Sequence, residues 1–362
     1  MHSAAARLVK LGLAEPEKAA ARLSEFPRLQ SHPQFIDELS LAADPDVALA
    51  TTLDWFADVD ERLASLWLED AGFRARWLLV TGASTAFGQF LVKHPHEASS
   101  LCDGGLWQSS ADRADLTQRL LTAVGAEWVA GRWIAATDDE AVLNALRIAY
   151  KREVISIAAR DLSGGAPLEI VAQQLSFLAD AVIEAATAIA WRSVNPDEPR
   201  VRLAVIAMGK CGGRELNYVS DVDVIFVAEP LDDQDTRALD EATRLASRLM
   251  HVCEQPTSEG TIWQVDAALR PEGKAGALVR TLDGHVAYYQ RWAETWEFQA
   301  LLKARAMAGD AELGAAYVDA ILPFVWQAAQ RPNFVEDVQA MRKRVVENIP
   351  PKELERELKL GV

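Results

Sequence analysis

Three aspartates between positions 221 and 266 of this 362-residue chain could hold divalent metal ions. Asp221 and Asp223 stand at the start of an apolar run, where alternating side chains would place both on one face of a strand and Val222 on the other. Adjacent carboxylates repel unless a cation lies between them, and Mg²⁺ accepts carboxylate and phosphate oxygens. If the run carrying Asp266 lies beside them, three carboxylates could hold two Mg²⁺ and support in-line displacement at phosphorus.

A glycine-rich loop precedes these aspartates. Gly209, Gly212 and Gly213 would let backbone N–H groups approach a phosphate closely, and Lys210 would add a positive charge. An isolated pair of aspartates is more often the exposed end of a strand. The glycine loop, the flanking apolar run and the segment carrying Asp266 together favour a metal site.

The pattern of apolar residues predicts the strands and helices that must position these residues. Residues 201–208 and 222–228 are short apolar runs typical of buried strands, and residues 261–269 alternate like a third strand. Residues 235–254, 282–309 and 334–359 have helical patterns. We therefore predict a small mixed sheet embedded in helices.

The first half of the chain is predicted to be helical to about residue 195. Residues 170–192 have apolar side chains at spacings of three and four, and a helix over 137–162 ends at a Ser-Gly-Gly sequence. The polar segment 193–199, with two prolines, is the best domain boundary. The predicted domains are a helical region over 1–197, a catalytic domain over 198–310, and the start of another helical region over 311–362.

Composition narrows the class of protein. The chain is 50% hydrophobic and 25% charged, which is ordinary for a folded protein. No apolar run is long enough for a membrane span or a signal peptide, and the three scattered cysteines form neither a disulfide framework nor a zinc pattern. The net charge of -16 opposes binding to nucleic acid. A cytoplasmic protein with no membrane or nucleic-acid partner is expected.

Residues 208–226 have the sequence MGKCGGRELNYVSDVDVIF. This segment resembles the signature of the glutamine synthetase adenylyltransferase family, a branch of the DNA polymerase beta-like nucleotidyltransferase superfamily. The resemblance covers about residues 75 to 362. Further matches follow in the family's order: Val265-Asp266, LRPEG at 269–273, Tyr288-Tyr289, Trp296-Glu297 and Lys303-Ala304-Arg305.

The resemblance implies an α+β, predominantly helical fold, with a polymerase beta-like nucleotidyltransferase domain and a small mixed sheet flanked by helical regions. Asp221, Asp223 and Asp266 would be the catalytic metal ligands for Mg²⁺. Residues implied in nucleotide or phosphate binding are Gly209, Lys210, Gly212, Gly213, Arg214, Ser220, Arg270, Lys303 and Arg305. Lys303 and Arg305, two residues apart on the predicted helix, would point to different faces, and Glu297 would play a supporting role.

The family's members are two-headed enzymes. One half attaches AMP from ATP to a tyrosine of glutamine synthetase, and the other removes it with phosphate and releases ADP. A PII-type signal protein and glutamine set the balance. This chain has a helical lead-in before its single motif and ends before a further family segment, so the expectation is a fragment containing the adenylyl-removing half. The alternatives are the forward, ATP-dependent reaction and a non-catalytic docking module for the PII-type protein.

Overall fold

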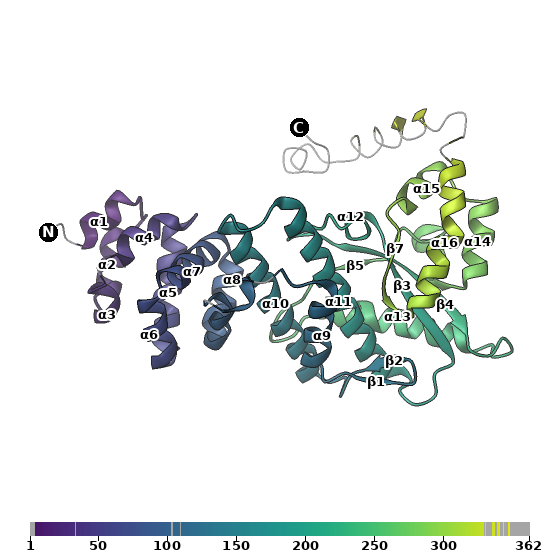
Figure 1. Ribbon diagram of the computed structural model, residues 1–362, viewed down its shortest axis with the longest axis horizontal. Coiled ribbons are helices and arrows are strands. Elements are labelled where there is room, and N and C mark those ends of the chain that lie inside the picture. The colour runs from purple at the N-terminus through teal and green to yellow at the C-terminus, as the bar shows by residue number, and fades with distance from the viewer. Residues whose placement is uncertain are drawn as a thin grey trace. The chain divides into compact units, whose positions relative to one another are not determined.

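The computed structural model describes residues 4–32, 34–102, 104–108 and 110–328, and single positions at 330, 335, 336, 339, 340, 343 and 347. The described chain is predominantly helical with one small mixed sheet, which confirms the predicted α+β class (Figure 1). It divides into two compact units. Unit 1 comprises Met1–Leu120 and Ala145–Leu178, and unit 2 comprises Leu121–Asn144 and Ala179–Val362. No helix within the described ranges is long and apolar enough to cross a membrane.

Unit 1 is built from short helices whose starts are encoded by side-chain caps. Asp44, Asp60, Asp70 and Ser84 each accept a hydrogen bond from the backbone N–H three residues ahead, which satisfies a donor that the helix leaves unpaired. Its helices are α1 (Ala4–Lys10), α2 (Pro16–Leu23), α3 (Pro27–Gln30), α4 (Phe35–Glu38), α5 (Pro45–Asp58), α6 (Glu61–Glu69), α7 (Ala71–Ala83) and α8 (Thr85–Lys93).

Three further helices contribute residues to both units: α9 (Arg113–Ala123), α10 (Glu140–Leu162) and α11 (Leu168–Val194). The helices predicted over 137–162 and 170–192 are confirmed by α10 and α11. Fully buried Trp55, Trp67 and Trp77 lie in the core of unit 1, where the rings of Trp55 and Trp77 are 4.7 Å apart.

Unit 2 contains the sheet, with strand order β5-β4-β3-β7 and β6 paired to β4. Strand β3 is antiparallel to β4 and β7, whereas β5 and β6 are parallel to β4. The strands are β3 (Val201–Ala207), β4 (Val222–Pro230), β5 (Val265–Asp266), β6 (Val279–Arg280) and β7 (Arg305–Gly309). The first two predicted strands are confirmed by β3 and β4, but the third shrinks to the two residues of β5.

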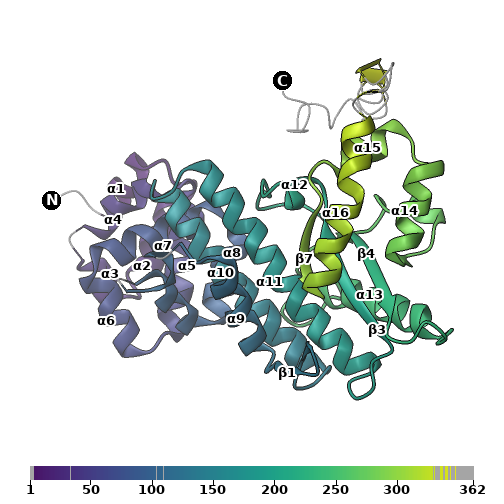
Figure 2. The same cartoon turned by 45° about the vertical axis from the view of Figure 1, so that its right-hand side comes forward.

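Helices cover both faces of this sheet (Figure 2). Alternate residues Ala204, Ile206, Ile225 and Val227 pack with the C-terminal helices. The intervening residues of β3 and β4, whose side chains point to the other face of the sheet, are also buried. Helix α13 also packs against β3 and β4. The helices of unit 2 are α12 (Gly209–Gly212), α13 (Ala238–Glu254), α14 (Leu282–Arg291), α15 (Thr295–Leu301) and α16 (Ala311–Ala328). The helix predicted over 235–254 is confirmed by α13.

Two sequence predictions need correction. The helix expected over 282–309 is two helices, α14 and α15, followed by strand β7, whose five residues ending in glycine are too few for a clear alternation. The first half also contains a hairpin, β1 (Glu127–Val129) and β2 (Arg132–Ile134), where only helices were expected. The helix predicted over 334–359 lies for the most part outside the described residues.

Candidate active site

The structure brings Asp221, Asp223 and Asp266 together in unit 2. Each offers one carboxylate oxygen, and these three oxygens lie within 4.8 Å of one another. Asp223 and Asp266 are direct partners across the parallel β4–β5 pair, and Asp221 immediately precedes β4. Asp221 is exposed and the other two are half-buried, so a ligand can reach the cluster from solvent.

Backbone pairing holds this cluster in place. The N–H of Val222 donates to the carbonyl of Gln264 at 3.0 Å, and the N–H of Met208 donates to the carbonyl of Asp223 at 2.9 Å. The side chains of Val222 and Val224 are fully buried, which leaves the aspartates on the opposite face of β4. The N–H of Ala268 donates to Asp266 Oδ1 at 2.7 Å and orients that carboxylate.

The glycine-rich loop forms α12, a single turn packed against the cluster. Gly209 has a φ of +54°, and a Cβ atom there would lie 2.4 Å from Asp223 Oδ2. A Cβ at Gly212 would lie 2.1 Å from the Lys303 carbonyl oxygen, and one at Gly213 would lie 2.7 Å from Lys303 Cδ. The N–H groups of Gly212 and Gly213 donate within this turn, to the carbonyls of Met208 and Gly209. These glycines therefore permit close packing of the loop.

Several of the predicted cationic residues lie around the turn. Lys210 Nζ donates to Asn217 Oδ1 at 2.7 Å, and Lys303 forms an ion pair with Glu215. Arg214 is exposed and adopts a φ of +59°. Ser220 Oγ lies 3.4 Å from Asp221 Oδ1, directly beside the carboxylate cluster.

Arg305 is the first residue of β7 and holds the C-terminal end of α12 by donating to backbone carbonyls there. Its guanidinium pairs with both oxygens of Asp180 on α11, at 2.6 and 2.9 Å, and donates to the carbonyl of Cys211 at 3.1 Å. Burial alone would lower the pKa of Arg305, but the hydrogen bonds and charge of Asp180 raise it. The expectation that Lys303 and Arg305 share a helix is wrong, since Lys303 lies in the turn before β7.

Asp180 is the residue in this arrangement that the sequence analysis missed. Its side chain is completely buried although it is an acid. The available signal was an acid within the largely apolar helix predicted over 170–192, because buried acids are almost always paired. Its partner could not be assigned while residue 305 was placed in a helix.

Arg270 and Glu297 organise loops in unit 2. Arg270 donates to the carbonyls of Ala267 and Gly276, at 2.8 and 3.2 Å, and so holds the loop that follows β5. Burial lowers the pKa of Arg270, and the nearby charge of Asp266 opposes this shift. Glu297 is buried, accepts the hydroxyl of Tyr288 at 2.9 Å and caps α15.

The donor set of the cluster fits a hard divalent cation. Three carboxylates packed this closely repel one another, whereas Lys210, Lys303 and Arg305 are engaged with other partners. Carboxylate oxygens are the ligands that Mg²⁺ and Mn²⁺ prefer, and bound Mg²⁺ usually leaves positions for phosphate oxygens. The exposed side of Asp221 leaves room for such a group.

Comparisons with known proteins agree on one family. The sequence profile described as glutamate-ammonia ligase adenylyltransferase matches residues 74–320. The bifunctional glutamine synthetase adenylyltransferase/adenylyl-removing enzyme of Streptomyces avermitilis is 48% identical over 98% of this chain and 35% of its own length. The proteins of the same name from Streptomyces coelicolor and Mycobacterium avium are 47% and 43% identical, over 98% and 97% of this chain and 35% and 34% of their own lengths. The chain thus spans about a third of these curated relatives.

Proposed function

The chain belongs to the glutamate-ammonia ligase adenylyltransferase family, and on that premise we propose that it is a Mg²⁺-dependent nucleotidyltransferase acting on glutamine synthetase. The observation that carries this proposal is the cluster of Asp221, Asp223 and Asp266 beside the glycine turn α12. The names of the relatives supply the substrate, and the cluster supplies a site able to bind a phosphate ester.

In this proposal the three aspartates hold one or two Mg²⁺. When bound, the metal neutralises negative charge on the phosphate under attack. Lys210 and Lys303 add positive charge beside α12, where it can stabilise the oxygens of the transferred group. The pair formed by Arg305 and Asp180 keeps α12 in register with β4, so that Gly209 stays against Asp223.

We propose further that this chain removes AMP from the adenylylated tyrosine. An oxygen of inorganic phosphate attacks the adenylyl phosphorus and a P–O–P bond forms. The bond from phosphorus to the tyrosine oxygen breaks, and the phenolate takes a proton from water. The products are ADP and unmodified tyrosine. Phosphate is already an anion at neutral pH, so the cationic residues around α12 need only bind and orient it.

The forward reaction is the second candidate, because the names of the relatives include both activities. In that direction the tyrosine hydroxyl attacks the α-phosphorus of ATP and pyrophosphate leaves. The same carboxylates would serve both directions, since each transfers an adenylyl group between two oxygens.

Two parallel reactions test the proposal. The chain is mixed with adenylylated glutamine synthetase, Mg²⁺ and phosphate, and separately with unmodified glutamine synthetase, Mg²⁺ and ATP. We expect phosphate-dependent ADP release that Asp221→Asn abolishes and that Asp319→Asn, an exposed carboxylate on α16, retains. AMP incorporation from ATP in place of ADP release would establish the forward direction. Inactivity in both reactions would contradict catalysis by this chain and favour a docking role for a PII-type protein.

A further inference from the structure

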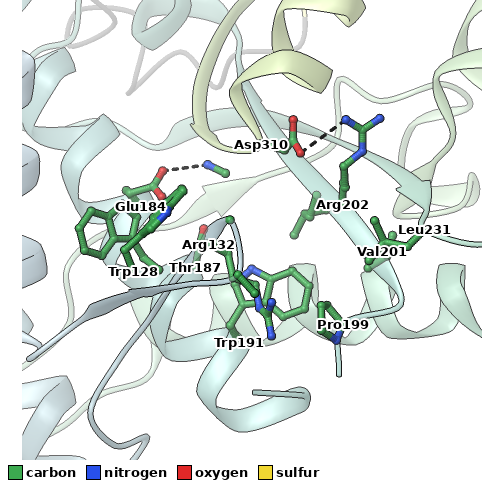
Figure 3. Close-up of a pocket in the computed structure, with 15 residues that line it drawn as sticks. Trp128, Arg132, Glu184, Thr187, Trp191, Pro199, Val201, Arg202, Leu231 and Asp310 are labelled. Atoms are coloured by element: carbon green, nitrogen blue, oxygen red, sulfur yellow. Dashed lines mark hydrogen bonds and ion pairs between the residues drawn. The ribbon is translucent and has the colours of Figure 1, made fainter. Parts of the chain in front are cut away.

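Unit 2 contains a cavity of about 180 Å³ at the end of the sheet remote from the aspartates (Figure 3). Strand β3 begins at the cavity with Val201 and ends beside the aspartates, where Met208 pairs with Asp223. Strand β7 runs from Arg305 near α12 to Gly309 at the cavity. The cavity is therefore separate from the carboxylate cluster, with the length of the strands between them.

Arg132, on the hairpin strand β2, is the unusual residue of this cavity. Arg132 is only 9% exposed, and its Nε and Nη1 atoms are buried with no hydrogen-bond partner among the residues that the structure describes. The remaining Nη2 donates to the carbonyl of Pro196 at 2.7 Å, and the guanidinium lies 5.0 Å from the ring centre of Trp191. Figure 3 shows the two side chains lying together at one side of the cavity.

A guanidinium in this position lacks the acceptors that buried cations normally have. Burial lowers the pKa of Arg132, and the charges of Glu241 and Asp197 oppose that shift, but neither acid forms an ion pair with it among the described residues. Arginine stays charged at neutral pH, and unsatisfied buried donors are costly. An anion entering the cavity would supply the missing acceptors.

The other charged groups of the cavity already have partners. Glu184 accepts the N–H of Gly309 at 2.8 Å, and Arg202 lies 3.7 Å from Asp310. Because Glu184 and Asp310 lie on its walls, the cavity suits a singly charged anion better than a phosphate dianion. The larger apolar side chains of the walls are those of Trp128, Trp133, Trp191, Pro199, Leu203 and Leu231.

We propose that this cavity binds a small carboxylate with a flat apolar body, whose carboxylate pairs with Arg132 and whose body lies against the tryptophans. Trp128 and Trp133 pack edge to face across the hairpin, with ring centres 5.2 Å apart, and Trp128 is 60% exposed at the opening. Indole faces accept flat apolar groups favourably, and a charge-assisted hydrogen bond fixes their orientation. The proposal is independent of adenylyl transfer.

Calorimetric titration with benzoate tests the proposal, with benzamide as a neutral molecule of the same shape. We expect saturable binding of one benzoate per chain. The affinity for benzamide should be lower by roughly tenfold or more. The absence of saturable benzoate binding up to about 10 mM would overturn the proposal. Equal affinity for benzamide would overturn the role of Arg132.

Two variants locate the binding. Arg132→Met keeps an unbranched side chain and removes the buried donors, so benzoate affinity should fall roughly tenfold or more while the melting temperature does not fall. Arg202→Gln is the matched control, because this arginine lines the same cavity but is paired with Asp310. Trp128→Ala, at the exposed opening, should lower the affinity for benzoate several-fold while the protein remains folded. Unchanged affinity in both Arg132→Met and Trp128→Ala would show binding elsewhere and overturn the proposal.

Discussion

Gly209 and Asp223 depend on each other's geometry. The glycine adopts a left-handed φ, and the aspartate carboxylate occupies the space that a side chain at position 209 would need. No other residue type meets both requirements, because an L-residue pays for the conformation and its Cβ displaces the carboxylate. The identity of a single glycine thus governs the position of a candidate metal ligand.

Gly209→Ala is expected to reduce adenylyl transfer roughly 100-fold, because displacement of a ligand by about 1 Å is enough to misalign the reacting groups. It should also cost about 1–2 kcal/mol of unfolding free energy from the left-handed backbone alone. Gly260→Ala is the control, since Gly260 has a φ of +82° with nothing within 4 Å of a Cβ. It should lose similar stability and keep full activity. Equal activity of the two variants would contradict this role for Gly209.

Prediction from sequence worked best where a short pattern fixes the geometry. The period of two along a strand placed Asp221 and Asp223 on one face, and the structure also brings Asp266 to them. Asp180 could not be assigned, because its role depends on Arg305 arriving from a strand 125 residues later in the chain. Long-range partners of buried charges leave little trace in local patterning.

At the scale of elements, α11, α12 and β7 are joined by the ion pair between Asp180 and Arg305. The Asp180 side chain is fully buried and that of Arg305 is 16% exposed. Asp180→Asn should therefore lower the free energy of unfolding by about 3 kcal/mol, because it leaves a buried guanidinium without its counter-charge. Urea denaturation measures this loss. Asp319→Asn, on the exposed face of α16, should change stability by less than about 0.5 kcal/mol. A similarly small effect of Asp180→Asn would contradict the proposed clamp.

Helix α14 carries a buried histidine that should make the stability of unit 2 depend on pH. His285 is 1% exposed, lies among Tyr289 and Tyr317, and its pKa is lowered by burial from 6.5 to about 4. Between these values the unfolded chain binds a proton that the folded chain does not. The free energy of unfolding should therefore fall as the pH drops from about 6.5 to 4, by roughly 3 kcal/mol in total.

His285→Phe keeps an aromatic ring and removes the titrating group, so this part of the acid dependence should disappear from urea denaturation curves at pH 5 and pH 7. His251→Gln, at an exposed position on α13, should retain the full dependence. If His285→Phe and the wild-type chain lose the same free energy between these pH values, His285 is not the group responsible.

The elements that sequence analysis missed are short. Strand β7 has five residues and the hairpin strands β1 and β2 have three each, whereas α10 and α11 have 23 and 27. A long helix repeats its apolar period several times, but a strand of three to five residues offers one or two alternations. The hairpin turn at Ala130-Gly131 does carry a glycine, with a φ of +83°, which was the available signal.

At the scale of the whole molecule, a net charge of -16 bears on the proposed chemistry. A strongly acidic protein repels phosphate and nucleotides unless cations are concentrated where these bind. Local lysines around α12 provide part of that charge, and a divalent metal on the three aspartates would provide the rest. In the proposed function the acidic composition and the metal site are connected, because anionic substrates would bind where a bound metal and nearby lysines offset the negative charge of the chain.

Titration of the nucleotide-free chain with Mn²⁺, followed by electron paramagnetic resonance of the unbound ion, tests the metal site most directly. The wild-type chain should remove one or two Mn²⁺ from solution per molecule, since this ion prefers the same oxygen ligands as Mg²⁺. Asp223→Asn should abolish that binding and Asp319→Asn should preserve it. Equal uptake of Mn²⁺ by the wild-type chain and Asp223→Asn, or no uptake by either, would contradict a metal centre at Asp221, Asp223 and Asp266.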